Sequence, residues 1–81
     1  MRKASKPGRQ LRKTIGENIR LERTRLDISQ EELAELAGMH RNYIGAVERA
    51  EISVGTDHVE RLAIALKLKP FQLLQELKRG D

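Results

Sequence analysis

Apolar residues recur at helical spacing from residue 10 onward. In the first stretch they lie on one stripe at 100° per residue: Leu11, Ile15, Ile19 and Leu26. This spacing predicts a first helix over residues 10–25. Residues 1–9 have no such period and are rich in basic residues with Pro and Gly, which is typical of a flexible arm. The chain therefore divides into a basic N-terminal arm at residues 1–9 and a helical domain at residues 10–78.

The segment Ser29-Gln30-Glu31-Glu32 has the pattern of a capping box, in which Ser29 is the N-cap and Glu32 reaches back to it. Ile28 and Leu33 are spaced for the accompanying hydrophobic staple. Gly38 is suited to end this helix in the left-handed conformation, after only about eight residues. Because so short a helix is unstable alone, it must be held by packing. The side chains expected to pack are Leu33, Ala34 and Ala37.

Helical spacing resumes almost at once, over residues 40–49. Ile44 and Val47 define an inward face. The residues expected to point outward are polar or small: Asn42, Gly45, Ala46 and Arg49. Two short helices joined by a tight turn that contains Gly indicate a helix-turn-helix.

Two further helices are predicted toward the C-terminus. One covers residues 56–66 after Gly55 as N-cap, and its buried residues are expected to be Val59, Leu62, Ala63 and Leu66. The other begins at Pro70 and ends near Lys78. His58 is expected at the surface. Strand signals are missing, so we predict an all-α domain of five short helices around one core.

The amino-acid composition limits which bonds, ligands and partners the chain can have. The chain has no Cys and two His, which excludes disulfides, and we expect no metal ion and no cofactor. No apolar run approaches the roughly 20 residues of a membrane span, so a cytoplasmic, membrane-free setting is expected. Residues 1–26 carry nine basic and two acidic side chains, whereas residues 27–81 carry seven and ten. This asymmetry favours a polyanion partner, with a solvated basic tail as the alternative.

The stretch from Ser29 to Gly38, followed by Tyr43-Ile44-Gly45-Ala46-Val47-Glu48-Arg49, resembles the lambda-repressor-like (XRE-type) helix-turn-helix family. Within that family it looks most like the restriction–modification controller proteins. The resemblance extends from about Leu11 to Leu77 and is more specific for the fold than for the biological role.

The resemblance implies roles for particular residues. Gln30 matches a glutamine that grips a phosphate, and His40 matches the N-terminal edge of the recognition helix. Positions that face base edges or flanking phosphates are matched by Arg41, Asn42, Tyr43 and Ala46. Arg23 and Glu48 match an ion pair that joins the first and third helices.

The side-chain chemistry agrees with these roles. Arg41 has the donors to bind guanine O6 and N7, Asn42 can pair with adenine N6 and N7, and the Ala46 methyl can touch a thymine methyl. Phosphate contacts are expected from Gln30 and Arg49. The sequence also departs from the family pattern: Ala50 and Asp27 stand where Gly is frequent, and Thr56 where an aliphatic residue is common. Either the turn at Ala50 differs, or Ala accepts a strained φ there.

The last predicted helix is more apolar than one buried face requires. Leu73 is assigned to the core, while Phe71, Leu74 and Leu77 are expected to form a two-fold dimer interface. The alternative is that these residues only cap the core. A dimer would place the two recognition helices about 34–36 Å apart, as needed to read a pseudo-palindrome.

Together these features predict a sequence-specific regulator of transcription that binds double-stranded DNA as a homodimer. By occupying an operator it either blocks RNA polymerase or contacts it. The alternative is a protein-interaction module such as a DNA-binding antitoxin. An enzyme is not expected, because the sequence offers no Ser/His/Asp or Cys/His set.

Overall fold

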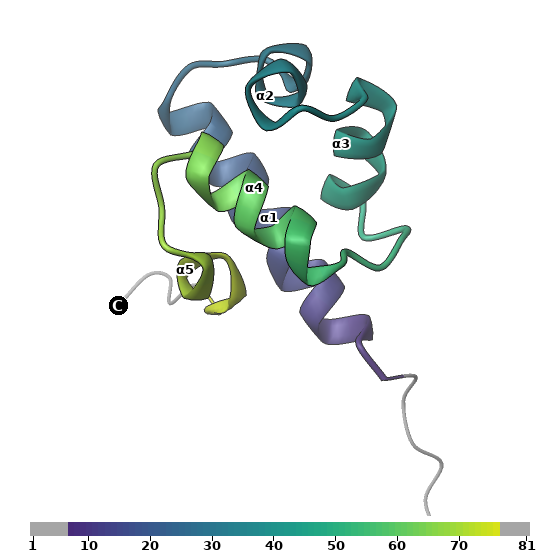
Figure 1. Cartoon of the computed structure of the whole chain (residues 1–81). Coiled ribbons are helices and arrows are strands. Elements are labelled where there is room, and N and C mark those ends of the chain that lie inside the picture. The colour runs from purple at the N-terminus through teal and green to yellow at the C-terminus, as the bar shows by residue number, and fades with distance from the viewer. Residues whose placement is uncertain (1–6, 77–81) are drawn as a thin grey trace, which may run out of the picture.

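The computed structural model describes residues 7–76, which form five α-helices and no strand (Figure 1). The helices are α1 (Arg9–Arg25), α2 (Gln30–Ala37), α3 (Arg41–Glu48), α4 (Thr56–Ala65) and α5 (Pro70–Leu74). The predicted all-α, five-helix fold is confirmed. Helix α1 begins one residue earlier than predicted, within the proposed arm, and residues 1–6 lie outside the described part of the chain.

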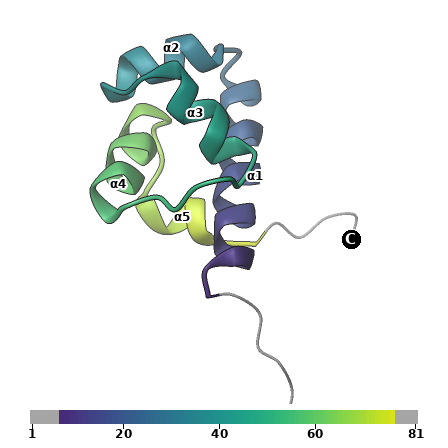
Figure 2. The same cartoon turned by 90° about the vertical axis from the view of Figure 1, so that its right-hand side faces the viewer.

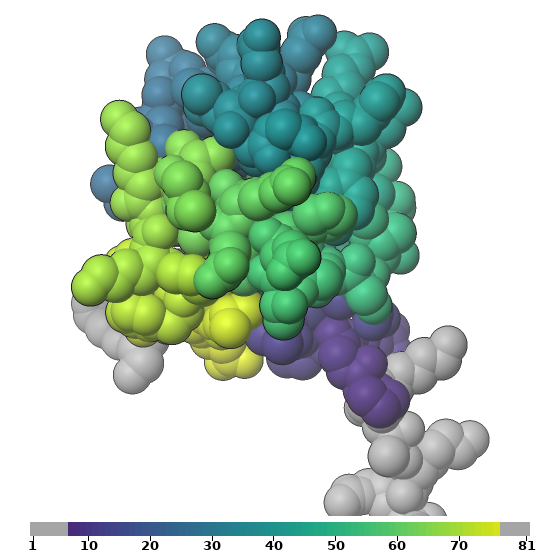
Figure 3. All heavy atoms as spheres, viewed as in Figure 1, coloured from purple at the N-terminus to yellow at the C-terminus, as the bar shows by residue number. Residues whose placement is uncertain are grey.

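The long helix α1 forms one side of the molecule, and the shorter helices pack beside it (Figure 2). It contacts α3 and α5, while α2 contacts α3 and α4, and α4 also contacts α5. On the side seen in Figure 3, α4 lies at the centre between α2 and α5. All five helices, together with the C-cap of α4 at Leu66, supply the largest fully buried side chains: Ile19, Leu33, Ile44, Val47, Leu62, Leu66 and Leu73.

The hydrophobic stripe of α1 is buried only in its middle. Ile15 and Ile19 belong to the core, whereas Leu11 is 46% exposed and Leu26 is 37% exposed. Leu26 follows the last helical residue, and Leu11 lies in the first turn, where it borders an open apolar groove. The stripe that predicted α1 is therefore in the core at its two middle residues and partly exposed at both ends.

Helices α1 to α4 all end in the same way, with one residue in the left-handed conformation. These residues are Asp27, Gly38, Ala50 and Lys67, with φ of 58°, 70°, 60° and 63°. In each case the following N–H donates to a carbonyl five residues earlier, at 2.8–3.1 Å, as in a Schellman motif. Of the two alternatives for Ala50, the left-handed backbone is the one adopted. This conformation costs an L-residue roughly 1–2 kcal/mol.

Helix α5 is shorter than predicted, because its backbone becomes extended at Gln75 (φ −79°, ψ 136°). The side chain of Asn18, which is 3% exposed, donates hydrogen bonds of 2.8 Å to the carbonyls of Leu73 and Gln75. A continuing helix would use the Leu73 carbonyl internally, so Asn18 stabilises the end of α5 where it stands. The predicted end near Lys78 is therefore wrong, and Leu77 lies outside the described residues.

Candidate nucleic-acid interface

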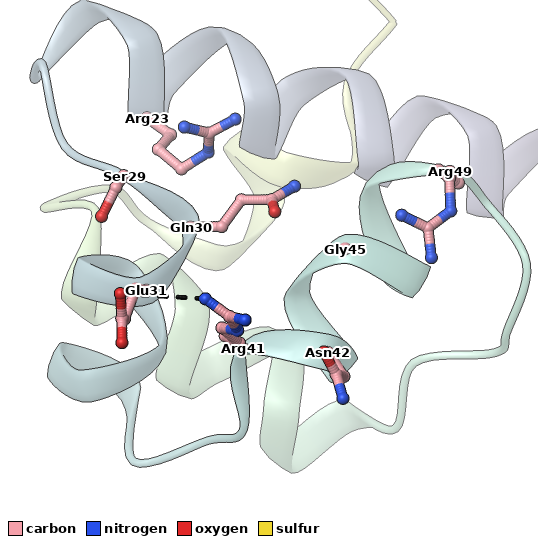
Figure 4. Close-up of a pocket in the computed structure, with 8 residues that line it drawn as sticks. All are labelled: Arg23, Ser29, Gln30, Glu31, Arg41, Asn42, Gly45 and Arg49. Atoms are coloured by element: carbon pink, nitrogen blue, oxygen red, sulfur yellow. Dashed lines mark ion pairs between the residues drawn. The ribbon is translucent and has the colours of Figure 1, made fainter.

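An open groove lies where α1, α2 and α3 meet. Its lining residues are Arg23, Ser29, Gln30, Glu31, Arg41, Asn42, Gly45 and Arg49 (Figure 4). The structure thus brings together four of the seven residues predicted to bind DNA. The other three, His40, Tyr43 and Ala46, belong to α3 or its N-cap but do not line this groove.

The N-terminus of α2 borders the groove, and its geometry is that of the predicted capping box. The Ser29 hydroxyl accepts from the Glu32 N–H at 2.9 Å, and Glu32 Oε1 accepts from the Ser29 N–H at 2.7 Å. Ile28 packs against the core cluster that contains the fully buried Leu33. These local interactions define where α2 begins and orient its positive dipole end beside the groove.

Glu48, at the end of α3, accepts three hydrogen bonds from two other segments. Arg23 donates from Nε at 2.8 Å and from Nη2 at 3.2 Å, and Gln30 donates from Nε2 at 3.0 Å. A further Arg23 nitrogen donates to the Ile28 carbonyl at 3.0 Å. The side chains of Arg23 and Glu48 are only 17% and 5% exposed. The predicted pair is therefore present, and it also holds one end of the Gln30 amide.

The N-terminus of α3 is capped by His40, whose Nδ1 accepts from the Asn42 N–H at 3.1 Å. Tyr43 is half-buried beside the core, and its hydroxyl lies 2.8 Å from Nδ1 of His58 on α4. The two rings meet edge to face with centroids 5.0 Å apart. Burial raises the pKa of Tyr43, so its hydroxyl stays neutral. His58, expected at the surface, is instead half-buried because it packs against Tyr43.

The two other arginines of the groove also lie beside glutamates. Arg41 is 4.0 Å from Glu31, an exposed and loose pair, whereas Arg49 makes two hydrogen bonds to Glu51 at 2.9 and 3.2 Å. The second pair raises the pKa of Arg49 and lowers the pKa of Glu51, chiefly through the hydrogen bonds between them. Both groups therefore stay charged over the neutral pH range.

Gly45 was expected to face outward, but it is buried. The Arg49 guanidinium lies against it, with Nη1 3.0 Å from the position that a Cβ would occupy. The outward surface of α3 near Gly45 is thus made by the side chain of Arg49.

Sequence reasoning missed Gly16, Asn18 and the partner of Tyr43. A Cβ on Gly16 would lie 2.6 Å from the Val47 carbonyl oxygen, so Gly16 lets α1 approach the end of α3 closely. Asn18 stands directly beside Ile19 on the helical stripe, and a polar residue at that place was an available signal of a buried hydrogen bond.

Two features are absent from residues 7–76. No three His, Asp or Glu side chains in this part of the chain gather closely enough to hold a metal ion. Within the same residues, no helix has the length and apolar character needed to cross a membrane.

Comparisons with known proteins agree with this geometry. A helix-turn-helix family model matches residues 19–74. A hypothetical transcription factor of Neisseria meningitidis is 41% identical over 64 residues, which cover 79% of this chain and 60% of that protein. This chain thus spans less than two thirds of that relative's length.

Two other similar proteins are named as regulators. The control protein C.SmaI of Serratia marcescens is 42% identical over 79% of this chain and 76% of its own. The crystal structure of the P22 c2 repressor with a synthetic operator has a TM-score of 0.71 and 33% identity, covering 75% of this chain and 92% of that one. The chain therefore belongs to the helix-turn-helix family, in its lambda-repressor-like branch, and it is similar to restriction–modification controller proteins.

Proposed function

We propose that this protein binds a specific double-stranded DNA operator through α3 and thereby regulates transcription. The observation that carries the proposal is the groove between α2 and α3, where Arg41, Asn42 and Arg49 gather beside the N-terminus of α2. Cationic and amide side chains at the start of one short helix, next to the start of another, match the way in which a helix-turn-helix meets a major groove.

Arg41 and Asn42 lie in the first turn of α3, where side chains of a recognition helix reach base edges. Arg41 donates to guanine and Asn42 pairs with adenine, while the Ala46 methyl approaches a thymine methyl. His40 and Tyr43 lie at the edges of this surface. We assign them to flanking phosphates.

Gln30 serves as a phosphate ligand in this scheme, and Arg49 becomes one when it leaves its pair with Glu51. Glu48 accepts one N–H of the Gln30 amide at 3.0 Å, and an amide nitrogen has two hydrogens. The second hydrogen remains for a phosphate oxygen, so the ion pair orients Gln30 for this contact.

Regulation by occupancy requires no catalytic group. The bound protein either blocks RNA polymerase or contacts it, and it acts in the cytoplasm, where the DNA is. The family consists of regulators rather than enzymes, which supports this view.

Replacing Arg41 with alanine is expected to remove the preference for one base pair of the operator. A good bidentate contact contributes about 1–3 kcal/mol of discrimination, or roughly 5- to 150-fold in relative affinity. The measurement is selection of bound sites from random duplex DNA with the wild-type protein and with Arg41→Ala. The proposal fails if the two proteins enrich the same site with equal preference.

Lys69→Ala is the matched control, because it removes an exposed positive charge at the N-cap of α5, outside the groove that Arg41 lines. It should leave the selected sequence unchanged. A loss of preference in the control as large as that in Arg41→Ala would mean that net charge, not base reading, sets the site.

We also propose that the protein binds as a homodimer through α5. Leu73 is fully buried and caps the core, whereas Phe71 and Leu74 are 57% and 41% exposed. Leu74 and Pro70 border an apolar groove together with Leu11 of α1. Capping of the core uses Leu73 alone, so the exposed apolar surface beside it supports a two-fold interface. Leu77, also assigned to this interface, lies outside the described residues.

Sedimentation at micromolar concentration tests this interface. The wild-type protein is expected to sediment at twice the 9.3 kDa chain mass, and the double variant Phe71→Glu/Leu74→Glu as a monomer. Leu36→Glu is the control, because Leu36 is 64% exposed on α2, away from the groove. A wild-type protein that sediments only at the mass of one chain would contradict the dimer.

A further inference from the structure

The turn after α3 holds a carboxylate against one of the proposed DNA-binding arginines. Glu51 accepts from Arg49 Nε at 2.9 Å and from Nη2 at 3.2 Å. The two side chains are 60% and 53% exposed, so the pair lies at the surface. Arg49 lines the groove, and its guanidinium turns back over α3 in Figure 4. The cation is thus already occupied in the protein without DNA.

The backbone places this carboxylate. The left-handed Ala50 allows its own N–H to donate to the Val47 carbonyl and the Glu51 N–H to donate to the Ala46 carbonyl, both at 3.0 Å. These two bonds define the position of Glu51 relative to the end of α3. The pair is therefore built by the turn rather than by two long side chains meeting from separate elements.

The geometry also shows that Glu51 and a DNA phosphate compete for the same donors of Arg49. An arginine binds a carboxylate or a phosphate through two parallel N–H donors, and Glu51 takes two such donors of Arg49 at once. The opposite edge of the guanidinium lies against Gly45, with Nη1 3.0 Å from the place of a Cβ. A phosphate that approaches this fork must displace the carboxylate and overcome its repulsion.

We infer that Glu51 is a specificity-determining residue, which withholds Arg49 from DNA of arbitrary sequence. This inference rests on the proposed function. On an operator, the contacts of Arg41 and Asn42 define the register, and Arg49 stays paired in the seated complex. On other duplexes nothing defines the register, and binding depends on phosphate contacts alone. An unpaired Arg49 would then take the nearest phosphate.

The test is Glu51→Gln, which removes the charge and keeps the shape of the side chain. Affinities are measured for the selected operator and for a scrambled duplex of equal length, at several salt concentrations. One additional phosphate contact steepens the salt dependence by about 0.9 and strengthens binding by about 8-fold at 0.1 M salt. We expect this gain on the scrambled duplex and a smaller gain on the operator, so the specificity ratio falls.

A double-mutant cycle with Arg49→Ala separates competition from general repulsion. If Glu51 acts through Arg49, Glu51→Gln has no effect on scrambled-duplex binding in the Arg49→Ala background. An equal gain in both backgrounds, an equal gain on both duplexes, or no gain on either would overturn the inference. Thermal melts confirm that each variant is folded.

The two proposals fail in distinguishable ways. A wild-type protein that shows no preference in selection contradicts the proposed function, and the scrambled-duplex cycle still reports on Glu51 and Arg49. A wild-type preference with no change in the specificity ratio contradicts the role of Glu51 alone.

Discussion

Replacing Glu48 with alanine is expected to destabilise the domain by about 3–5 kcal/mol, because it breaks a buried ion pair from one side. Arg23 would remain with 17% of its side chain exposed and without its carboxylate. Gln30 would lose its acceptor as well. Urea-induced unfolding monitored by circular dichroism gives the free energy of unfolding directly.

The informative comparison is the double variant Arg23→Met/Glu48→Leu. Apolar replacement of a whole buried pair is often neutral or stabilising, because the desolvation of both charges is removed together. The double variant is therefore expected to cost less than Glu48→Ala alone. If Glu48→Ala lowers the free energy of unfolding no more than the double variant does, Arg23 and Glu48 are not a buried pair in which each depends on the other.

Glu31→Ala serves as the control for loss of a carboxylate. Its pair with Arg41 spans 4.0 Å, with 75% of the Glu31 side chain and 64% of the Arg41 side chain exposed. Exposed pairs contribute about 0–1 kcal/mol, so this variant should unfold almost as the wild type does.

The fold was predictable where the sequence signal is local. Ser29 and Glu32 bond to each other across three residues, and Gly38 takes its left-handed conformation within the turn it ends. Such features depend on neighbouring residues alone, and the periodicity of apolar side chains places the helices between them. The boundaries of α2, and the start and buried face of α4, followed from these signals.

Features that depend on distant segments were not predictable. Asn18 ends α5 across more than 50 residues of chain, and the partner of Tyr43 stands 15 residues away on another helix. No pattern around Gly16 shows that a carbonyl of α3 lies above it. The Arg23–Glu48 pair was found through family resemblance, because its two members are also far apart in sequence.

The sequence predicted which residues lie on the proposed DNA-facing surface. It did not predict the ion pair that one of them makes within the protein. Arg41, Asn42 and Arg49 were placed on this surface from helical spacing and resemblance. The pairing of Arg49 with Glu51 depends on the left-handed Ala50, and the sequence left two alternatives open for that turn. The backbone conformation of this one residue sets where Glu51 stands relative to Arg49, the C-cap of α3.

Replacement by alanine should lower the stability of the domain at Gly16 in α1 and raise it at Gly45 in α3. Gly16→Ala would place a Cβ 2.6 Å from the Val47 carbonyl oxygen and 2.7 Å from that of Glu48. These are backbone atoms at the end of α3, so the helices must separate. We expect a loss of about 1–3 kcal/mol, even though alanine favours a helix over glycine by about 1 kcal/mol.

Gly45→Ala is the matched control, because its nearest obstacle is Nη1 of Arg49, at 3.0 Å. That group is the end of an exposed, flexible side chain and can move aside. The helix preference of alanine then dominates, and a gain of up to about 1 kcal/mol is expected. Thermal melts of both variants show whether each substitution raises or lowers Tm. A change of 1 kcal/mol in the free energy of unfolding shifts Tm by roughly 4–8 °C for a domain of this size. If both variants melt above the wild type, α1 and α3 are not in close contact at Gly16, and the position of the recognition helix does not depend on that glycine.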